Sequence, residues 1–240
     1  APLRLNADND LLGTIQLSNR KIITYGIKSP YVDVKAEKVE CHDSFMSFHI
    51  LYRGRSFATK IPMIGEHHVL NALAAFAVGT CAGISPEEIV EALPGYEASG
   101  MRQKIVDFRG ITVIEDCYNA SPDSMLAAIK VLQAMPCGGR RIAVLGDMLE
   151  LGSYSKEAHE SVGAMAAEYG VDVVLGFGEE SRYLCESAKT HGVNMVYYCE
   201  KKPEIVQWLK EHTKRGDTVL LKASRGMKFE EIAEAFYGEE

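Results

Sequence analysis

The sequence contains no apolar run near the roughly 20 residues that a membrane-spanning helix needs, because charged side chains interrupt every hydrophobic stretch. Its first six residues, APLRLN, also lack the charged and then apolar order of a signal peptide. These two absences exclude an integral membrane protein of the helical kind. We therefore expect a cytoplasmic protein that does not act at a membrane.

Basic residues are not in excess either. The formal net charge is −7 at pH 7, and basic pairs such as Arg140-Arg141 and Lys201-Lys202 are isolated rather than joined into a stripe. A nucleic-acid surface needs clustered Lys and Arg to neutralise phosphates. The charge pattern therefore argues against a nucleic-acid partner, and we interpret the pairs as solvated loop charges.

Two further motifs are missing. The six cysteines show no C-x-x-C spacing, so the sequence indicates reduced thiols rather than a zinc site or a disulfide framework. No Gly-Lys pair occurs, which excludes a phosphate loop of the form G-x-x-x-x-G-K-[ST] within these residues. Residues 176–181, GFGEES, begin like a dinucleotide fingerprint but lack its third glycine and carry a glutamate pair that would repel pyrophosphate.

Local patterns divide the chain into two halves. In the first half, alternating residues on both sides of Arg53-Gly54-Arg55 predict a β-hairpin over residues 45–62. An Ala- and Leu-rich stretch predicts a buried helix over residues 69–79. Ser85, followed by proline and then by glutamate at the third helical position, predicts the start of another helix. We expect a linker between domains at residues 95–100.

The second half alternates short apolar strands with amphipathic helices, after a predicted hairpin over residues 104–115. Such alternation is typical of β-α-β units. The predicted fold class is α/β, with a doubly wound, mostly parallel, Rossmann-like sheet in this half. The expected strands are 142–146, 171–176, 193–198 and 218–222, and the expected helices are 122–135, 155–169, 180–191, 203–213 and 228–236.

Ligands of doubly wound sheets bind beyond the carboxyl ends of the strands. Residues 115–125, EDCYNASPDSM, follow a predicted strand and begin a helix at Pro122, with Ser121 as its cap. The Asp116 carboxylate at this point is suited to accept hydrogen bonds from ribose hydroxyls. The alternative is a turn aspartate that bonds its own backbone.

The same segment resembles a signature of the Mur ligase family, D-x-Y-N-A-N-P-D-S-M, in the members that join D-alanyl-D-alanine to a UDP-muramoyl tripeptide. Ser121 is the one departure. Four other segments resemble the family in order and spacing, so the resemblance covers nearly the whole chain. They are residues 5–9 (LNADN), 65–75 (GEHHVLNALAA), 145–152 (LGDMLELG) and 221–227 (LKASRGM).

The resemblance implies a domain assignment. Residues 1–98 would form the rear part of a central ATP-binding domain, and residues 99–240 a complete C-terminal ligase domain. The family places its phosphate loop and its magnesium ligands upstream of Asn6. We therefore expect ATP and Mg as cofactors of the full-length enzyme, no metal ligand within this chain, and no turnover by these 240 residues alone.

Roles for nucleotide-binding residues also follow from the resemblance. Asn71 would hydrogen-bond adenine, and Arg102 would reach the phosphates and act in catalysis. Asp116, Tyr118 and Asn119 would complete the nucleotide site. The alternatives are a helix-terminal asparagine and an exposed linker arginine. His67 matches a histidine of the family motif, and both it and His68, where the family usually has asparagine, are interpreted as structural.

Lys222 and Ser224 are the expected residues for the incoming amino substrate, with Lys222 also catalytic. A simple surface lysine is the alternative. The resemblance assigns no distinct roles to Asp147, Glu150 and His159. The implied partners are small molecules, namely the UDP-muramoyl tripeptide, D-alanyl-D-alanine and ATP, and we expect a monomer.

Two kinds of rival function remain open at this point. Another Mur-type ligase, or a folate polyglutamate ligase, would share the fold and ATP chemistry, although Tyr118-Asn119-Ala120 disfavours both. A non-catalytic nucleotide- or partner-binding module on the same scaffold is the rival from a different class, because fold alone does not fix function.

Overall fold

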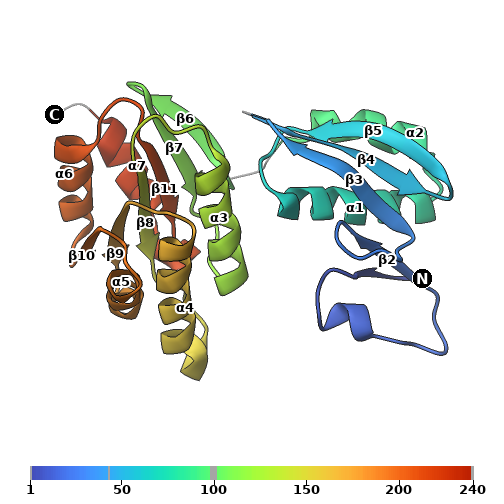
Figure 1. Ribbon diagram of the computed structural model, residues 1–240, viewed down its shortest axis with the longest axis horizontal. Coiled ribbons are helices and arrows are strands. Elements are labelled where there is room, and N and C mark those ends of the chain that lie inside the picture. Colours follow the sequence, from blue (N-terminus) through green and yellow to red (C-terminus); the bar gives the residue numbers. More distant parts are fainter. Residues whose placement is uncertain (1, 43, 98–101, 239–240) are drawn as a thin grey trace. The chain divides into compact units, whose positions relative to one another are not determined.

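The computed structural model describes residues 2–42, 44–97 and 102–238. Figure 1 shows its two units, Ala1–Glu97 and Ala98–Glu240. Of the linker expected at residues 95–100, positions 98–100 lie outside the described residues. Each unit has its own sheet, and the α/β fold class is confirmed.

The first unit contains a five-stranded sheet in the order β1-β2-β3-β4-β5. β1, β2 and β3 are parallel neighbours, whereas β3, β4 and β5 pair antiparallel. The predicted hairpin is confirmed as β4 and β5, whose two-residue turn places Arg53 and Gly54 at positive φ. The strands are β1 (Leu3–Asn6), β2 (Ile22–Gly26), β3 (Val34–Cys41), β4 (Met46–Tyr52) and β5 (Arg55–Ile61).

Two helices complete this unit, α1 (Glu66–Cys81) and α2 (Pro86–Ala92). α1 buries Val69, Leu73 and Phe76, spaced four and three residues apart, in a core shared with the sheet. The capping box at Ser85 is confirmed, because its hydroxyl accepts from the Glu88 amide and the Glu88 carboxylate accepts from the Ser85 amide. Both predicted helices therefore exist, and α1 is longer than predicted.

The segment 5–9 has a structural explanation in the loop after β1. The Asp8 carboxylate accepts hydrogen bonds from the backbone amides of Ile27 at 2.6 Å and Ser29 at 2.8 Å, which follow β2. Gly26 is required beside it, because a Cβ there would lie 2.6 Å from an Asp8 oxygen. Asp8 thus ties together the loops that follow two neighbouring parallel strands.

The second unit contains a six-stranded sheet in the order β10-β9-β8-β11-β7-β6, in which β6 pairs antiparallel and all other neighbours are parallel. The predicted alternation and the second hairpin are confirmed. The strands are β6 (Lys104–Phe108), β7 (Ile111–Asp116), β8 (Arg141–Gly146), β9 (Val173–Phe177), β10 (Met195–Cys199) and β11 (Thr218–Lys222). The helices are α3 (Pro122–Ala134), α4 (Ser155–Glu168), α5 (Ser181–Thr190), α6 (Lys202–His212) and α7 (Glu230–Tyr237).

The helices of this unit form two layers, as Figure 1 shows. α3, α4 and α5 pack in series along one face, and α6 packs against α7 on the other. The chain runs outward from β8 to β10 and then returns to place β11 between β8 and β7. The carboxyl ends of β7, β11 and β8 therefore surround the point where the strand order reverses, which is where such sheets bind ligands.

Close packing of α4 against α5 depends on Gly163. A Cβ at this position would clash with the Leu184 carbonyl and lie 2.8 Å from the Ala188 nitrogen. We expect Gly163→Ala to lower the free energy of unfolding by about 1–2 kcal/mol, since the overpacking exceeds the gain in helix propensity. Gly138→Ala is the control, because nothing lies within 4 Å of a Cβ there. Equal urea midpoints for the two variants, followed by fluorescence, would contradict this packing.

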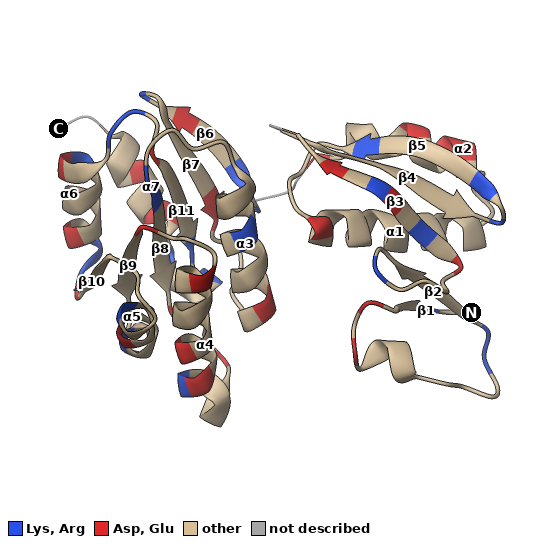
Figure 2. Cartoon of the chain, in the orientation of Figure 1, with Lys and Arg blue, Asp and Glu red and all other residues tan. Residues whose placement is uncertain are grey.

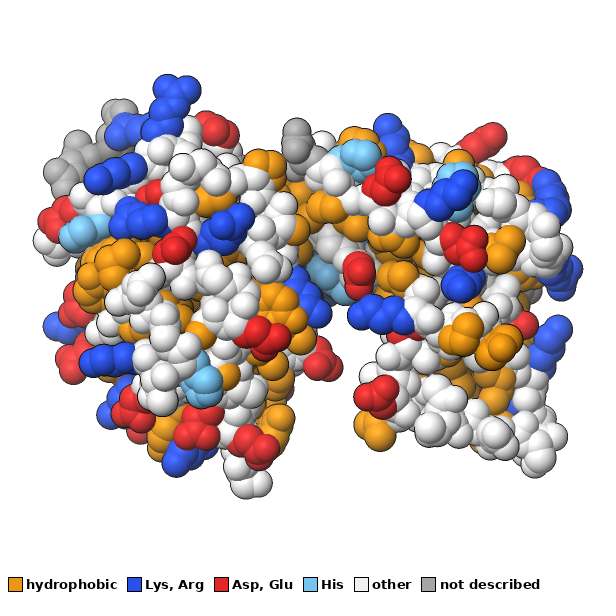
Figure 3. Space-filling model, in the orientation of Figure 1, with side chains coloured by type: hydrophobic (Ala, Val, Ile, Leu, Met, Phe, Trp, Pro, Cys, Tyr) orange, Lys and Arg blue, Asp and Glu red, His pale blue; other side chains and the backbone are white. Residues whose placement is uncertain are grey.

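Charges of both signs are interspersed over the helices and strands of each unit, as Figure 2 shows, with no stripe of one sign. Figure 3 shows one face, on which hydrophobic side chains are scattered among charged ones. No helix in the described part of the chain is long and apolar enough to cross a membrane.

Candidate active site

Lys222 and Asp116 form a buried ion pair at the carboxyl edge of the second sheet. They end the neighbouring strands β11 and β7 and are directly paired in register. The Lys222 Nζ donates to Asp116 Oδ2 at 2.6 Å and to the Asn119 carbonyl at 3.0 Å. Its side chain is only 2% exposed, whereas that of Asp116 is 23% exposed. The lysine is thus enclosed, and the carboxylate still reaches the surface.

The loop after Asp116 is fixed by its own hydrogen bonds. The Asn119 side chain accepts from the Ala120 amide at 2.9 Å, and Ser121 caps α3 as predicted. Burial raises the pKa of the Cys117 thiol to about 12, with the neighbouring Asp116 charge as a smaller cause. The Cys117 thiol is therefore protonated at neutral pH and is no nucleophile.

Arg102 lies beside this loop. Its guanidinium carbon is 4.2 Å from the centroid of the Tyr118 ring, which is 46% exposed. Stacking of this kind orients a guanidinium without using its N–H donors. The structure thus brings together five residues predicted for the site: Arg102, Asp116, Tyr118, Asn119 and Lys222.

Ser224 organises the neighbouring loop after β8. Its amide donates to the Asp147 carbonyl at 3.1 Å, and its hydroxyl accepts from the Leu149 amide at 2.9 Å. Ser224 is only 4% exposed. Like Lys222, it points toward protein groups. Both side chains therefore hydrogen-bond to the loops at the carboxyl ends of the strands.

The sequence assigned no role to Asp147 and His159. In the structure, both hold the loop after β8 through hydrogen bonds to backbone groups. The Asp147 carboxylate accepts from the Ser181 amide at 2.8 Å and hydroxyl at 2.7 Å, which fixes the start of α5. The buried His159 accepts from the Met148 amide at 3.0 Å through Nε2, so its proton lies on Nδ1, facing the Ser155 carbonyl. Glu150 lies in the same loop at positive φ.

Asn71 belongs to the first unit and is described apart from the others. It lies on α1 and lines a mostly apolar hollow of about 130 Å³. Its neighbours there include His68, Met63 and Tyr96. The rings of His67 and His68 are 4.0 Å apart. The adenine-binding role expected for Asn71 stays a prediction.

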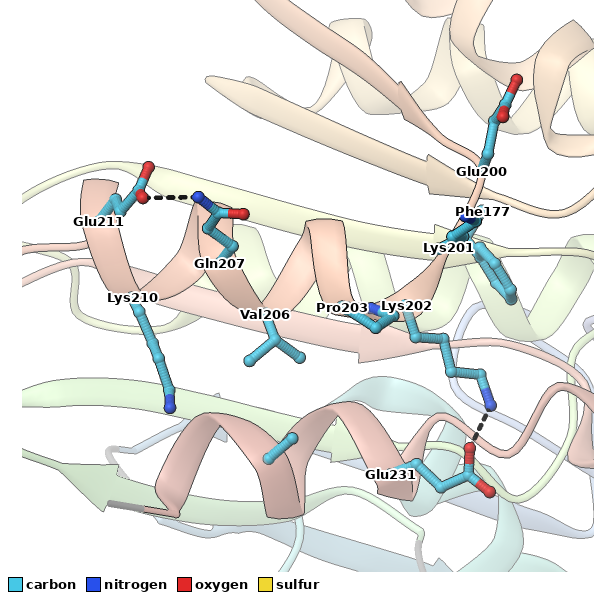
Figure 4. Close-up of a pocket in the computed structure, with 11 residues that line it drawn as sticks. Phe177, Glu200, Lys201, Lys202, Pro203, Val206, Gln207, Lys210, Glu211 and Glu231 are labelled. Atoms are coloured by element: carbon cyan, nitrogen blue, oxygen red, sulfur yellow. Dashed lines mark hydrogen bonds and ion pairs between the residues drawn. The ribbon is translucent and has the colours of Figure 1, made fainter. Parts of the chain in front are cut away.

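A larger hollow of about 820 Å³ lies between α6 and α7 and contains none of the predicted site residues. Figure 4 shows Lys202 paired with Glu231 at 2.7 Å and Gln207 bonded to Glu211 at 2.9 Å along its walls. Three lysines and three glutamates line it, so its charge favours neither anions nor cations. We assign it no role in the site.

Sequence reasoning missed one exposed group at this edge. Arg225 directly follows Ser224, is exposed, and donates to Glu230 of α7 at 2.9 Å. It lies within the matched segment 221–227, but exposure is not visible in a sequence.

Comparison with known proteins shows the family of the chain. The family model for the glutamate ligase domain of Mur ligases matches residues 101–225, and that for the Mur ligase middle domain matches residues 3–79. The chain is 40% identical over 187 residues to a Bacillus subtilis protein named UDP-N-acetylmuramoyl-tripeptide--D-alanyl-D-alanine ligase, covering 77% of this chain and 41% of that protein. An Escherichia coli protein of the same name is 30% identical over 235 residues, covering 96% of this chain and 51% of the relative.

Solved structures give the same result. MurF from Acinetobacter baumannii superposes with a TM-score of 0.81 at 26% identity, covering 92% of this chain and 47% of that one. MurF from Thermotoga maritima in complex with ADP gives a TM-score of 0.84 at 23% identity, covering 99% of this chain and 53% of that one. The chain therefore spans about half the length of the relatives it matches. Because one family model alone covers more than half of the chain and includes the whole Asp116–Lys222 edge, the chain belongs to the Mur ligase family.

Proposed function

We propose that this chain is the rear part of an ATP-dependent ligase that joins D-alanyl-D-alanine to a UDP-N-acetylmuramoyl tripeptide in the cytoplasm. Residues 1–98 would be the rear of the ATP-binding domain, and residues 99–240 the C-terminal ligase domain. The observation that carries the proposal is the 40% identity over 187 residues to a ligase of that name. The paired edge of Asp116 and Lys222, with Arg102 beside it, supports it chemically.

The reaction class is acyl transfer in two steps. The terminal carboxylate of the tripeptide attacks the γ-phosphorus of ATP, which forms an acyl phosphate and releases ADP. The dipeptide amine then attacks the acyl carbon, and the bond to phosphate breaks. Negative charge develops in both steps and must be stabilised by fixed cations and dipoles.

Asn71 would recognise adenine, and the exposed part of Asp116 would accept from a ribose hydroxyl. Asn119 supports Asp116 through its carbonyl, which shares the Lys222 ammonium. Because Lys222 neutralises Asp116, the carboxylate can lie near phosphates without adding an uncompensated negative charge. Lys222 and Ser224 therefore act in this proposal by holding the site in shape, rather than through direct contact with the substrate.

Magnesium is also expected in this class, with its ligands upstream of Asn6 as the resemblance implies. The described residues include no group of three or more His, Cys, Asp or Glu side chains that could hold a metal ion. We derive no step through it. The nucleotide is supported by the Thermotoga maritima relative, which is described as a complex with ADP.

The test is phosphate release by the full-length protein that contains these residues. We expect release from ATP that requires both the tripeptide nucleotide and D-alanyl-D-alanine, with amide-bond formation confirmed by mass spectrometry. Release with a dipeptide nucleotide and a single amino acid would instead favour a ligase for the third residue. Release with folate and glutamate would favour a polyglutamate ligase. If no phosphate is released under any of these conditions, a binding module is favoured.

A further inference from the structure

We propose that two copies of this protein pair through the outer edge of β10, in antiparallel register about Tyr197. The inference goes beyond the proposed function, and it departs from the monomer expected from the sequence. β10 lies at the border of the second sheet, as Figure 1 shows, and among the described residues it pairs with β9 alone. The outer side of such a strand carries backbone groups that can bond a further strand.

The backbone groups of Val196 and Tyr198 point away from β9. The Met195 amide donates to the Asp172 carbonyl at 3.3 Å, so it faces β9. Alternate residues of a strand bond to the same neighbour, so Tyr197 faces β9 as well. In the described part of the chain, no loop or side chain hydrogen-bonds the outward N–H and C=O groups of Val196 and Tyr198. These two residues therefore offer donors and acceptors to a further strand.

The composition of β10 differs from that of the other edge strands that the structure describes. β1, β5 and β6 each carry at least one charged residue, including Arg4, Lys60 and Lys104 respectively. Charged side chains on an edge strand oppose its pairing with another chain. β10 reads MVYYC and contains neither a charged residue nor a proline. Its edge therefore lacks the usual features that prevent strand addition.

The partner that fits this edge is a second copy of β10. In an antiparallel pairing with its twofold axis at Tyr197, this tyrosine meets its own copy, and Val196 meets Tyr198 of the other copy. Val196 and Tyr198 then form the hydrogen-bonded pair, which agrees with their outward backbone groups, and the two Tyr197 side chains form the closer, non-bonded pair. Aromatic–aromatic and aromatic–β-branched pairs stabilise neighbouring strands. The strand is therefore complementary to itself in this register, and no like charges meet.

The two tyrosines are accessible for such contacts. Tyr197 is 40% exposed and its ring centroid lies 5.5 Å from that of Trp208 in α6. Tyr198 is 39% exposed and its ring lies 5.9 Å from the guanidinium carbon of Arg182 in α5. The pairing would bury an aromatic ring on each face of the joined sheet. Because β10 has only five residues, the contact is small, and the association is expected to be weak.

The experiment measures the mass of the full-length protein by sedimentation equilibrium. The average mass should rise toward twice that of the monomer between about 5 and 500 µM, as expected for a small interface. Tyr197→Lys and Tyr197→Glu should each weaken association by at least about tenfold, because like charges then meet at the axis. An equimolar mixture of the two variants should associate again, since opposite charges then meet. A wild type that stays monomeric over this range would overturn the proposal, whatever other partner binds the edge.

Ile105→Lys is the matched control, because Ile105 is 39% exposed and lies on β6, the edge strand at the other border of the same sheet. It should associate like the wild type. Hydrogen exchange of the wild type gives a second readout: the Val196 and Tyr198 amides should exchange at least about threefold more slowly at high concentration, and the Tyr197 amide should not change. Equal weakening by Ile105→Lys, no recovery in the mixture, or no added protection of Val196 and Tyr198 would each contradict the pairing. The exchange result decides the question if the Tyr197 variants do not fold.

Discussion

Replacement of Lys222 by methionine should lower the free energy of unfolding of the second unit by about 3 kcal/mol. The change keeps most of the side-chain volume but removes the ammonium. Asp116 and the Asn119 carbonyl then lose a partner that bonds them at 2.6 Å and 3.0 Å. A buried ion pair broken on one side is costly because the remaining charge stays desolvated. The 23% exposure of Asp116 gives it some water, which places the loss at the lower end of the range.

The chain offers a control in Lys202, 21% exposed, which bonds the Glu231 carboxylate at 2.7 Å and the Lys228 carbonyl at 3.1 Å. Lys202→Met should cost less than about 1 kcal/mol, because Glu231 is 53% exposed and stays solvated when its partner is removed. Adding Asp116→Asn to Lys222→Met should restore part of the loss, because no unpaired charge then remains. Trp208 is the single tryptophan and lies in α6, so its fluorescence in urea reports on this unit alone. Equal losses for the Lys222 and Lys202 variants would refute the buried pair.

The Asp116–Lys222 pair also shows where sequence reasoning stopped. The alternation of strands and helices predicted both residues at the carboxyl ends of their strands, and this is confirmed. It did not predict that β11 lies between β8 and β7, because the order of strands depends on which crossovers skip a neighbour. Lys222 and Asp116 are 106 residues apart, so their contact depends entirely on that order.

Local signals explain the other differences. Ser85 has a capping box, and its helix was predicted at the correct residue. α1 begins at Glu66, three residues before the predicted start. The sequence did not indicate this start, because Gly65 supplies no side-chain cap. β1, β2 and β3 were not predicted. β1 has only four residues, too few for alternation to be recognised.

The candidate site was predicted in part. The resemblance to the family named Arg102, Asp116, Tyr118, Asn119 and Lys222, and the structure places these residues together. Their roles stay predictions. Burial could not be predicted from motif membership, since Lys222 and Arg225 lie in one matched segment with opposite exposure.

Arg102→Ala in the full-length ligase should lower kcat by about 10²- to 10³-fold and change the KM for ATP by no more than a few fold. The guanidinium stacks on Tyr118 at 4.2 Å, and this contact uses the face of the group rather than its donors. The N–H fork is therefore not used by this contact, and in the proposed function it would bind phosphoryl oxygens. Charge on these oxygens is redistributed most in the transition state, so the arginine should contribute to turnover more than to ground-state binding.

Graded variants separate charge, fork and stacking. Arg102→Lys keeps the charge but lacks the fork and should recover only part of the activity. Tyr118→Ala should cost about three- to fivefold in kcat, as expected for loss of an exposed cation–π contact, whereas Tyr118→Phe keeps the ring and should stay near wild type. Arg109→Ala is the matched control, since Arg109 stacks on Phe108 at 5.1 Å in the turn between β6 and β7, at the opposite ends of the parallel strands. If Arg109→Ala and Arg102→Ala lose turnover equally, or if Arg102→Ala acts on the KM for ATP alone, Arg102 does not act on the transferring phosphoryl group.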